Sequence, residues 1–377
     1  MRINLMDKLK TFIKKEIVLV ISMILAAVSC FFVSPDSLYF SYIDYRTLVI
    51  LLSLMITMAG FQKQNVFKQI GEFLVNKMNS SRGVIIIFVA LCFISSMFIT
   101  NDVALLTFVP FSIITLTIAD RKDLFINTIV LETIAANLGS MLTPLGNPQN
   151  LYLYSLSNMA IGEFIMLMLP YSIASAIVLF IFCIICIDKK AIALTEKTTY
   201  FRTAHDRKLI LMYSISFLLS ILVVAHVIPY QAGLLIILAF VLIFDREIII
   251  KPDYSLILTF VFLFIFIGNI KRIPALNDML HAIVNSHEIS TSIILSQFIS
   301  NVPAAILCSG FTSDISKLII GTNVGGLGTL IASMASLISF KQYIKTKNAD
   351  TKKYISVFTV YNIVFLLVMI AIVFLFH

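Results

Sequence analysis

Charged residues are scarce in this sequence: they make up 13% of its 377 residues, whereas 59% are hydrophobic. A soluble protein of this length needs polar faces on its helices, and here most apolar segments are apolar all round. These segments run for about 16 to 25 residues, the length that spans the core of a bilayer. The scarcity of charge therefore argues against a soluble domain and predicts an all-α polytopic membrane protein.

Patterns for metal, nucleotide and nucleic-acid binding are missing as well. The five histidines are scattered, and Cys183-x-x-Cys186 has no second pair or nearby histidine. Gly325-Gly326-x-Gly328 lacks the lysine of a Walker loop and any preceding strand. The net charge of +8 is not gathered in a compact basic domain. We expect no resident cofactor, no ATP as energy source and no nucleic-acid partner.

Polar motifs interrupt the apolar segments, and each of them occurs twice. Phe98-Ile99-Thr100-Asn101-Asp102 matches Phe298-Ile299-Ser300-Asn301-Val302-Pro303 some two hundred residues later. Asn137-Leu138-Gly139-Ser140-x-x-Thr143 likewise matches Asn323-Val324-Gly325-Gly326-x-x-Thr329. The chain therefore consists of two copies of one unit, and each copy breaks its own helices at two places.

The apolar segments and polar loops divide the chain into three parts. The first repeat covers residues 1–188, with a re-entrant hairpin at about 83–119 and a broken helix at about 124–158. Residues 189–230 are a cytoplasmic linker and a connecting span. The second repeat covers 231–377, with a hairpin at about 289–311 and a broken helix at about 317–340. Amphipathic helices at about 62–82 and 271–288 lie in the membrane interface. This layout predicts nine crossings and two hairpins.

Lysine and arginine test the layout, because cytoplasmic loops carry an excess of both. A cytoplasmic N-terminus puts all but four of the 28 Lys and Arg residues inside; the exceptions are Arg46, Lys271, Arg272 and Lys317. The first hairpin then opens to the cytoplasm, the second opens to the exterior, and the C-terminus lies outside. The two copies are thus predicted to be inverted repeats in the cytoplasmic membrane.

Helix breaks inside a bilayer require a reason, because each unpaired backbone group costs several kcal/mol in hydrocarbon. Paired breaks in inverted repeats are the sequence pointer to a transporter's substrate site. The helix N-termini at such breaks attract anions, and the freed carbonyls can bind a small cation such as sodium. The pattern predicts anion binding together with cation binding.

The motifs resemble those of the ion transporter superfamily, which holds divalent anion:sodium symporters, citrate and arsenite permeases and a class of sodium/proton antiporters. The resemblance rests on Thr-Asn-Asp with Ala104, on Thr107-x-x-Pro110, on Thr143-Pro144-x-Gly146-x-Pro148-x-Asn150 and on Ser300-Asn301-x-Pro303. It covers nearly the whole chain in order and spacing. It implies two inverted repeats, re-entrant hairpins, a homodimer and an elevator-like movement of the substrate-carrying part.

The resemblance also assigns roles to individual residues. Substrate-binding positions are Thr100, Asn101, Ser300, Asn301, Pro303, Asn147, Pro148, Asn150 and Thr329. Coupling-ion positions are Asp102, Asn101, Asn137, Gly139, Thr143, Asn301, Asn323 and Gly325. Val302 stands where the symporters have a second hydroxyl, and Ala332-Ser333-Met334-Ala335-Ser336 lacks the Pro and Asn of the first broken helix. The two copies are therefore not expected to hold equivalent sodium sites.

Two carboxylates fall within predicted membrane segments. An ionised carboxylate near the bilayer centre is costly unless it pairs with a cation or takes up a proton. Asp102 is expected to bind a coupling sodium or carry a proton; capping the second helix of the hairpin is the structural alternative. Glu132 lies seven residues before Gly139, and a proton site and a helix-packing hydrogen bond remain equally open for it.

The sequence thus predicts a secondary active transporter of small anions, di- or tricarboxylates among them, coupled to sodium or protons, and no enzyme. The alternatives within transport are arsenite efflux and sodium/proton antiport, which the Asn101-Asp102 pair favours. A membrane-embedded enzyme would need a nucleophile and base or a metal cluster at the breaks, and a receptor would not need paired breaks. The expected partners are the anionic substrate, the lipid bilayer and a second copy of the chain.

Overall fold

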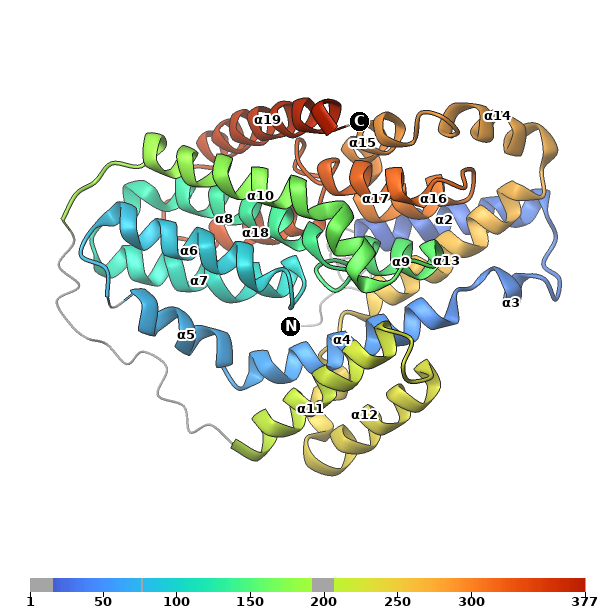
Figure 1. The fold of residues 1–377 in the computed structure, drawn as a ribbon, viewed down its shortest axis with the longest axis horizontal. Coiled ribbons are helices and arrows are strands. Elements are labelled where there is room, and N and C mark those ends of the chain that lie inside the picture. Colours follow the sequence, from blue (N-terminus) through green and yellow to red (C-terminus); the bar gives the residue numbers. More distant parts are fainter. Residues whose placement is uncertain (1–15, 76, 192–206, 377) are drawn as a thin grey trace, which may run out of the picture.

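A computed structural model describes residues 16–75, 77–191 and 207–376, and helices make up most of these ranges (Figure 1). Within them there is one isolated β-bridge, between Ser80 and Ala191, and no strand. The predicted basic N-terminal segment and most of the cytoplasmic linker lie outside the described residues. In chain order the α-helices are α2 (Ile17–Phe32), α3 (Tyr39–Tyr42), α4 (Tyr45–Lys63), α5 (Val66–Val75), α6 (Ser81–Ser95), α7 (Asn101–Ile118), α8 (Phe125–Gly139), α9 (Pro148–Ser157), α10 (Ile161–Cys186), α11 (Arg207–Val224), α12 (Tyr230–Phe244), α13 (Tyr254–Lys271), α14 (Pro274–Val284), α15 (Glu288–Ile299), α16 (Asn301–Ser309), α17 (Ile315–Val324), α18 (Met334–Tyr343) and α19 (Thr351–Phe376). Three short 3-10 helices are η1 (Lys122–Leu124), η2 (Ser140–Leu142) and η3 (Arg246–Ile250).

Many of these helices suit a bilayer. Seven of the described helical segments are long and apolar enough to cross a membrane, and five shorter ones are also apolar. The long helices α10 and α19 are largely uncovered, with Ile185 74% and Phe374 78% exposed. Apolar surface of this extent is stable against lipid and not against water. The prediction of an all-α polytopic membrane protein is confirmed.

Short polar side chains set where several helices begin. Asp44, Ser80, Asp253 and Asp314 each accept a hydrogen bond from a backbone N–H in the first turn of α4, α6, α13 and α17, respectively. Such a cap satisfies one of the four N–H groups that a helix start leaves without a partner, and is worth about 1 kcal/mol. The apolar helices therefore begin at positions that the sequence marks with a polar residue.

The centre of the molecule contains two helical hairpins, each packed against two half-helices. The hairpin of α6 and α7 packs against α8 and α18, whereas the hairpin of α15 and α16 packs against α17 and α9. Each hairpin thus contacts the first half of its own broken helix and the second half of the other one. This exchange brings segments of the two copies side by side (Figure 1).

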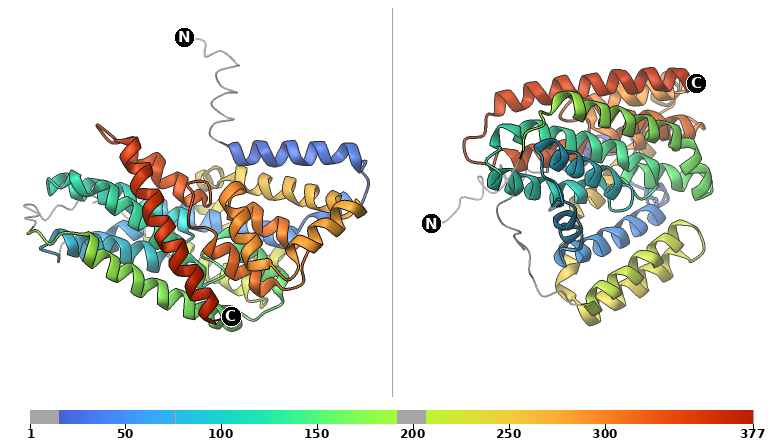
Figure 2. Two further views of the ribbon diagram at one scale, coloured as in Figure 1. Left: turned by 90° about the horizontal axis from the view of Figure 1, so that it is seen from above. Right: turned by 60° about the vertical axis from the view of Figure 1, so that its left-hand side comes forward.

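A second group of helices lies beside this centre. α2 packs along α13, and α4 packs against α11 and α12, which stand apart from the rest of the body (Figures 1 and 2). α4 also contacts α9, and α13 contacts α16. The two groups therefore meet along α4 and α13.

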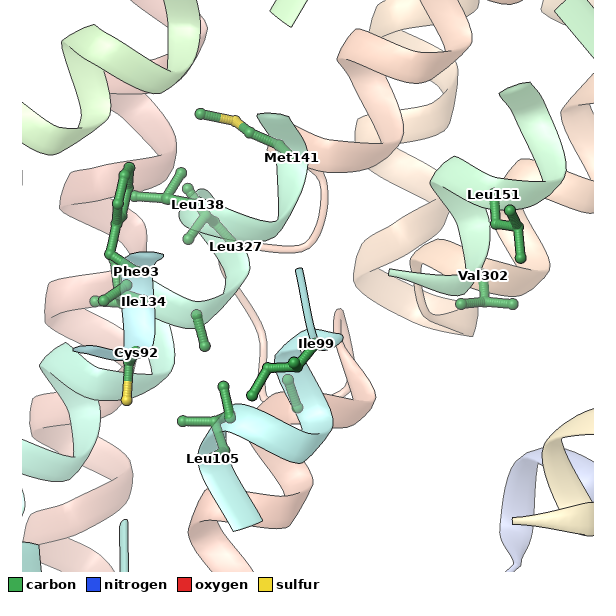
Figure 3. Packing of buried hydrophobic residues seen from close by; sticks show 14 of the residues in the cluster. Cys92, Phe93, Ile99, Leu105, Ile134, Leu138, Met141, Leu151, Val302 and Leu327 are labelled. Carbon is green, nitrogen blue, oxygen red and sulfur yellow. The ribbon is translucent and has the colours of Figure 1, made fainter. Parts of the chain in front are cut away.

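Close apolar packing holds the hairpins in place. Figure 3 shows Cys92 and Phe93 of α6 beside Ile134 and Leu138 of α8, and all four side chains are buried. In the second hairpin, α16 packs in the same way against α9. In a membrane the gain comes from dispersion contacts between fitted surfaces, because lipid tails are as apolar as the side chains.

Ion pairs tie loops together at the helix ends. Lys63 of α4 contacts Asp245 after α12 at 2.7 Å. Arg121 after α7 contacts Asp188 after α10 at 2.8 Å, and its guanidinium lowers the pKa of that carboxyl below the ordinary value. Because each pair joins two segments far apart in the sequence, these ends are clamped to one another.

Candidate functional site

The first hairpin turns at a strained residue. α6 ends at Ser95 and α7 begins at Asn101, and Thr100 before it has a φ of +27°. Positive φ is uncommon in residues other than glycine and persists only where the surroundings hold it. The Asn101 N–H donates to the Gly146 carbonyl at 3.0 Å, inside the first helix break. The tip of this hairpin is therefore fixed to the break.

The second hairpin repeats this arrangement. Ser300 has a φ of +72°, and the N–H of Asn301 donates to the Ala332 carbonyl at 2.9 Å, inside the second helix break. The Ser300 hydroxyl is buried and has no hydrogen-bond partner among the described residues. Pro303 is buried in the first turn of α16, where its missing N–H leaves no donor unpaired. The two tips share one backbone geometry.

The half-helices that follow the breaks start on side-chain caps. Asn147 accepts a hydrogen bond from the Asn150 N–H at 2.9 Å, and Pro148 takes the first helical position of α9. Ser333 plays the same role for α18 by accepting from the Ala335 N–H at 3.2 Å. Proline at the first position and Asn or Ser before it are the residues that favour a helix start. Both helices therefore resume after the break.

The same two caps also link the copies to each other. The Asn147 Nδ2 donates to the Asn323 Oδ1 at 3.1 Å, across 176 residues of sequence. The Ser333 hydroxyl donates to the Asn137 Oδ1 at 2.9 Å, across 196 residues. Each cap thus bonds to the asparagine on the first half-helix of the other copy. Buried amides paired in this way are costly to separate, because each unsatisfied group loses about 1–3 kcal/mol.

Asn101 and Asn150 extend this asparagine network. Asn101 of the first tip donates to the Asn137 Oδ1 at 3.1 Å, and Asn150 accepts from the Asn323 Nδ2 at 2.6 Å. The Asn150 amide also donates to the carbonyls of residues 140, 141 and 143, where the first half-helix ends. Asn301 makes a looser contact, because its amide packs against the backbone of Gly326. The six predicted asparagines therefore gather around one centre.

Two of the three predicted threonines, Thr143 and Thr329, connect the hairpins to the breaks. The Thr143 hydroxyl donates to the Met97 carbonyl of the first hairpin. The Thr329 hydroxyl donates to the Gln297 carbonyl of the second hairpin at 2.9 Å. The Gln297 amide in turn donates to the carbonyls of Gly325 and Leu327 at 3.0 Å. Both threonines, and Gln297, which the sequence marks only as a polar group in a helix, hold the hairpins against the breaks.

The two predicted glycines allow close packing. A Cβ on Gly139 would lie 2.0 Å from the carbonyl oxygen of Phe93 in α6. A Cβ on Gly325 would lie 2.7 Å from the Ser296 hydroxyl in α15. Each half-helix can therefore approach its hairpin at these points only because glycine has no side chain.

A cavity of about 160 Å³ reaches the first hairpin tip from the ends of α4 and α13. Thr100, Asp102 and Pro148 form its inner wall. Lys251 and Asp253 belong to the loop that precedes α13 and line the same cavity. Of the predicted site residues, Thr100, Asp102 and Pro148 line this cavity, and none of the six asparagines does.

Asp102 carries one of the two carboxylates on this cavity. Its side chain is partly buried, and its Oδ1 has no hydrogen-bond partner in the described part of the chain. The carboxylate of Asp253 interacts with it electrostatically within the cavity lining. Like charges repel, so two carboxylates on one small cavity favour a cation or a proton between them. Sequence analysis missed Asp253, because a Pro-Asp pair before a helix signals only a cap.

Glu132 lies outside this cavity. It is fully buried on α8, and the Ser112 hydroxyl of α7 donates to its Oε2 at 2.9 Å. Its Oε1 has no partner among the described residues. The helix-packing hydrogen bond considered from the sequence is therefore present, but it satisfies only one of the two oxygens.

The site offers amides, hydroxyls and backbone groups, and the cavity at its edge carries the carboxylates of Asp102 and Asp253. Helices α7, α9, α16 and α18 all begin at the tips or breaks, and their N-termini favour negative charge. Oxygen atoms of Asn, Thr and Asp suit a hard cation. Within the described residues, no group of three or more His, Cys, Asp or Glu side chains could hold a metal ion. This chemistry suits reversible binding of small ions.

Comparison with known proteins identifies the family of this chain. Residues 9–317 match the family model described as citrate transporter. The chain is 32% identical to the uncharacterized transporter MJ0456 of Methanocaldococcus jannaschii, over 88% of this chain and 90% of that protein. It is 30% identical to the inner membrane protein YbiR of Escherichia coli, over 79% and 80% of the two chains. A 46 kDa membrane protein of Mycobacterium leprae matches at 21% identity over 81% of each chain. The predicted resemblance is confirmed, and the chain belongs to the citrate transporter family of membrane transporters.

Proposed function

We propose that this protein is a secondary active transporter that moves a small anion, of the di- or tricarboxylate class, with sodium ions or protons. The proposal rests above all on the asparagine network between the two copies. Asn147 bonds to Asn323, and Ser333 bonds to Asn137, so both helix breaks and the first hairpin tip converge on one polar centre. A site built equally from two copies suits a substrate that is approached from either side in turn.

In this proposal, Asn101, Asn301, Thr100 and Ser300 bind the anion together with the helix N-termini beside them. The Ser300 hydroxyl is buried and unpaired, so it is free to donate to a substrate oxygen. Asn147, Pro148, Asn150 and Thr329 complete the substrate site, mainly by holding the breaks in place.

Asp102 supplies the coupling. An ionised Asp102 repels an anion in the same cavity, and a bound sodium ion or proton removes that repulsion. The anion therefore binds well only after Asp102 is neutralised, which makes the two binding steps interdependent. Asn101, Asn137, Gly139 and Thr143 are the ion's other positions in the first copy, and Asn301, Asn323 and Gly325 those in the second.

The proposed orientation has the N-terminus in the cytoplasm and the C-terminus outside, with inverted repeats and re-entrant hairpins. Two ion pairs support it, because each joins segments that the charge distribution assigns to one side. Arg121 and Asp188 both belong to the cytoplasmic side, and Arg272 and Asp36 both belong to the exterior. A homodimer and an elevator-like movement of the two hairpins against α4 and α13 complete the proposal, on the strength of the family resemblance.

Ligand-induced stabilisation tests the proposed function. The chain has no tryptophan, but Cys92, Cys183 and Cys308 are free and buried. A maleimide dye that fluoresces on reacting with these thiols therefore reports unfolding of detergent-purified protein. We expect citrate or succinate to raise the melting temperature in sodium or at one of two pH values, because a ligand bound to the native state stabilises it. No shift with any of a panel of anions would contradict the proposal.

A second function, sodium/proton antiport, is favoured by one observation. The cavity at the first tip carries two carboxylates, Asp102 and Asp253, and one cation, Lys251. In that case sodium or pH alone shifts the melting temperature, no anion adds to the shift, and Asp102→Asn abolishes it. Arsenite efflux predicts stabilisation by arsenite instead, so the same assay separates the three.

A further inference from the structure

A second cavity, of about 300 Å³, lies at the other end of the boundary between the two groups of helices. The cavity beside Asp102 lies near the end of α4 and the start of α13, whereas this one lies near the start of α4 and the end of α13. Its opposite wall comes from α9 and α16. We call it the outer cavity, because the charge distribution assigns this end of α13 to the exterior. The boundary therefore has one cavity at each of its two ends.

The last turns of α13 present one face to the outer cavity. The α13 residues that line it have the three- and four-residue spacing that places side chains on one face of a helix: Phe264, Ile267, Gly268 and Lys271. The Tyr42 ring of α3 covers this face at Gly268, where a Cβ would lie 2.3 Å from the ring. Lys271 follows one helical turn later, so Tyr42 and Lys271 are neighbours on the wall of the cavity.

The stem of Lys271 crosses from α13 to the second hairpin. Its Cε lies 3.1 Å from the position that a Cβ would take at Gly310, directly after α16, and Gly310 also lines the cavity. The ammonium group at the end of this stem makes no ion pair or hydrogen bond with any other described residue. Lys271 therefore brings an unpaired positive charge to the place where the two groups of helices meet.

An unpaired cation on this side of the membrane requires a reason, because Lys and Arg are concentrated on the cytoplasmic side. Two of the four exceptions to that distribution are paired with carboxylates. Arg272 contacts Asp36 at 2.8 Å. Lys317 contacts Asp314 at 3.0 Å. The end of a helix favours a cation, but Arg272 at the C-cap of α13 already supplies one there. Neither an ion pair nor the helix dipole therefore accounts for Lys271.

The other polar groups of the outer cavity leave the charge of Lys271 uncompensated. Asp44 accepts from the N–H and the hydroxyl of Thr47 at 3.0 Å and 2.5 Å, so its carboxylate is engaged in the cap of α4. The Tyr42 hydroxyl accepts from Arg272 at 3.0 Å and donates to no described residue. Its hydrogen is therefore available to an acceptor. An ammonium group and a hydroxyl hydrogen that both lack an acceptor suit an oxyanion.

The outer cavity ends before the second hairpin tip. Ile306 lines it and lies five residues, about 7.5 Å along α16, from Asn301. Leu151 of α9 and Val302 of α16 are buried where these two helices pack together (Figure 3). Along their helices, both lie between a predicted site asparagine and the lining of the cavity. An anion in the outer cavity is therefore separated from the site at the tips.

We propose that the outer cavity is an anion-binding site, in which Lys271 and Tyr42 bind a carboxylate group of the transported anion before it reaches the hairpin tips. This inference rests on the proposed function and adds a second binding position on one side of the membrane. Binding here is reversible, and no covalent bond forms. A local positive charge raises the concentration of anions beside the second hairpin. Transport from this side then reaches half its maximal rate at a lower anion concentration.

Charged thiol reagents test the outer site without any substrate. Ser41 of α3 is exposed and lines the cavity, so Ser41→Cys places a thiol there. In detergent at low salt, we expect this thiol to favour an anionic methanethiosulfonate reagent over a cationic one, because opposite charges attract. Lys271→Gln should lower the ratio of the two rates about threefold or more. Lys317→Gln, which removes a paired cation outside the cavity, should leave the ratio unchanged.

Mass spectrometry of the peptide that carries position 41 measures both rates and keeps them apart from those of the native cysteines. An unchanged ratio in Lys271→Gln overturns the inference. Citrate or succinate should slow the reaction with the anionic reagent, and Lys271→Gln should remove that protection. A lipid phosphate has the same oxyanion chemistry as a carboxylate. Protection by added phosphatidylglycerol but by neither carboxylate would assign Lys271 to a lipid headgroup, and it too overturns the inference.

Transport kinetics from each face of the membrane test the role of the site, with citrate as the probe. In right-side-out vesicles, Lys271→Gln should raise KM about fivefold or more with kcat nearly unchanged, because it removes binding that precedes translocation. In inside-out vesicles its KM should stay at the wild-type value. Lys271→Arg keeps the cation and should restore the wild-type KM, and Lys317→Gln should not alter it.

The same measurements separate failure of this inference from failure of the proposed function. An equal rise in KM on both faces, or none on either, in Lys271→Gln overturns the outer site, while anion transport itself stands. If the wild type is neither stabilised by any anion nor transports one, the proposed function is contradicted instead. The ratio of thiol reaction rates still decides in that case whether Lys271 attracts anions to the outer cavity.

Discussion

The two hairpin tips have one backbone and two chemistries. Thr100 and Ser300 both have positive φ, and the residue after each donates its N–H to a carbonyl in the helix break of its own copy. The side chains then differ: Asp102 lines a cavity, whereas Val302 at the equivalent position is buried. The comparison shows that both tips share one backbone geometry, whereas only the first tip carries a charged side chain. A single coupling position in the first copy is the simplest reading of that difference.

The broken helices differ in a similar way. Asn147 and Ser333 are both caps, and both bond to the asparagine of the other copy. The Asn150 amide in addition donates to three carbonyls at the end of the first half-helix, whereas the Ser336 hydroxyl at the equivalent position has no hydrogen-bond partner in the described part of the protein. The first break is therefore the more rigid of the two by hydrogen bonding.

The largest expected effect comes from the glycines that bring each half-helix against its hairpin. Gly139→Ala forces a methyl group against the Phe93 backbone carbonyl, which cannot move alone, and should cost about 3 kcal/mol. Gly325→Ala meets the movable Ser296 hydroxyl first and should cost about 1 kcal/mol. The thiol-dye melting curve measures both. Equal losses would show that the two hairpins are packed alike.

The second-largest difference in stability is expected between substitutions of the two helix caps, Asn147 and Ser333. Asn147→Ala removes a cap and leaves the Asn323 carbonyl oxygen without its donor, so we expect a loss of about 2 to 3 kcal/mol. Ser333→Ala also removes a cap, but the Asn137 Oδ1 that loses its donor still accepts from Asn101, so the cost should be about 1 kcal/mol. Ser290→Ala, at an exposed position on α15, is the control and should be neutral. If Ser333→Ala lost more stability than Asn147→Ala, the second break and not the first would be the more rigid one.

The charge difference between the tips should appear in ligand binding. Asp102→Asn keeps the size of the side chain and removes its charge, so sodium or proton binding should weaken about tenfold or more, equivalent to about 1.4 kcal/mol. Val302→Thr at the equivalent position should change the affinity for sodium or protons by less than about threefold. Melting temperatures across a sodium series at two pH values measure both. Normal sodium and pH dependence in Asp102→Asn would remove the coupling role from the first tip.

The smallest effect is expected at the loops beyond the hairpins. Arg121 lowers the pKa of Asp188, so the contact stabilises the fold above the ordinary aspartate pKa of about 3.9 and loses that effect as the pH falls through the lowered value. Asp188→Asn should therefore lower the melting temperature slightly at pH about 7 and not at pH about 2. The pair of Lys317 and Asp314 beyond the second hairpin lies within one helical turn. Asp314→Ala should consequently have a different effect, dominated by loss of the α17 cap. A loss in Asp188→Asn that is equal at both pH values would argue against the ion pair.

Much of this site was predictable because its signals are local. Runs of apolar residues indicate that the helices lie in lipid. The pair Asn147-Pro148 indicates a helix start from local sequence alone. The repeat of Thr100-Asn101 as Ser300-Asn301 is visible in the sequence without any structure. The contacts of each side chain were less predictable: the sequence did not indicate that the hydroxyls of Thr143 and Thr329 donate to hairpin carbonyls.

What the sequence by itself determined is the all-α membrane fold, the places where helices break and the doubling of the motifs, because each depends on neighbouring residues. Only the tertiary structure decided which residues of the other copy each side chain contacts. Asn147 pairs with Asn323, and Asp102 and Asp253 line one cavity, across distances in sequence that no local pattern records. The hydrogen bonds of Thr133 to Ser339 and of Ser333 to Asn137 also exist only once α18 packs against α8. Such contacts depend on how the hairpins exchange half-helices, and that choice is made by packing between segments far apart in the chain.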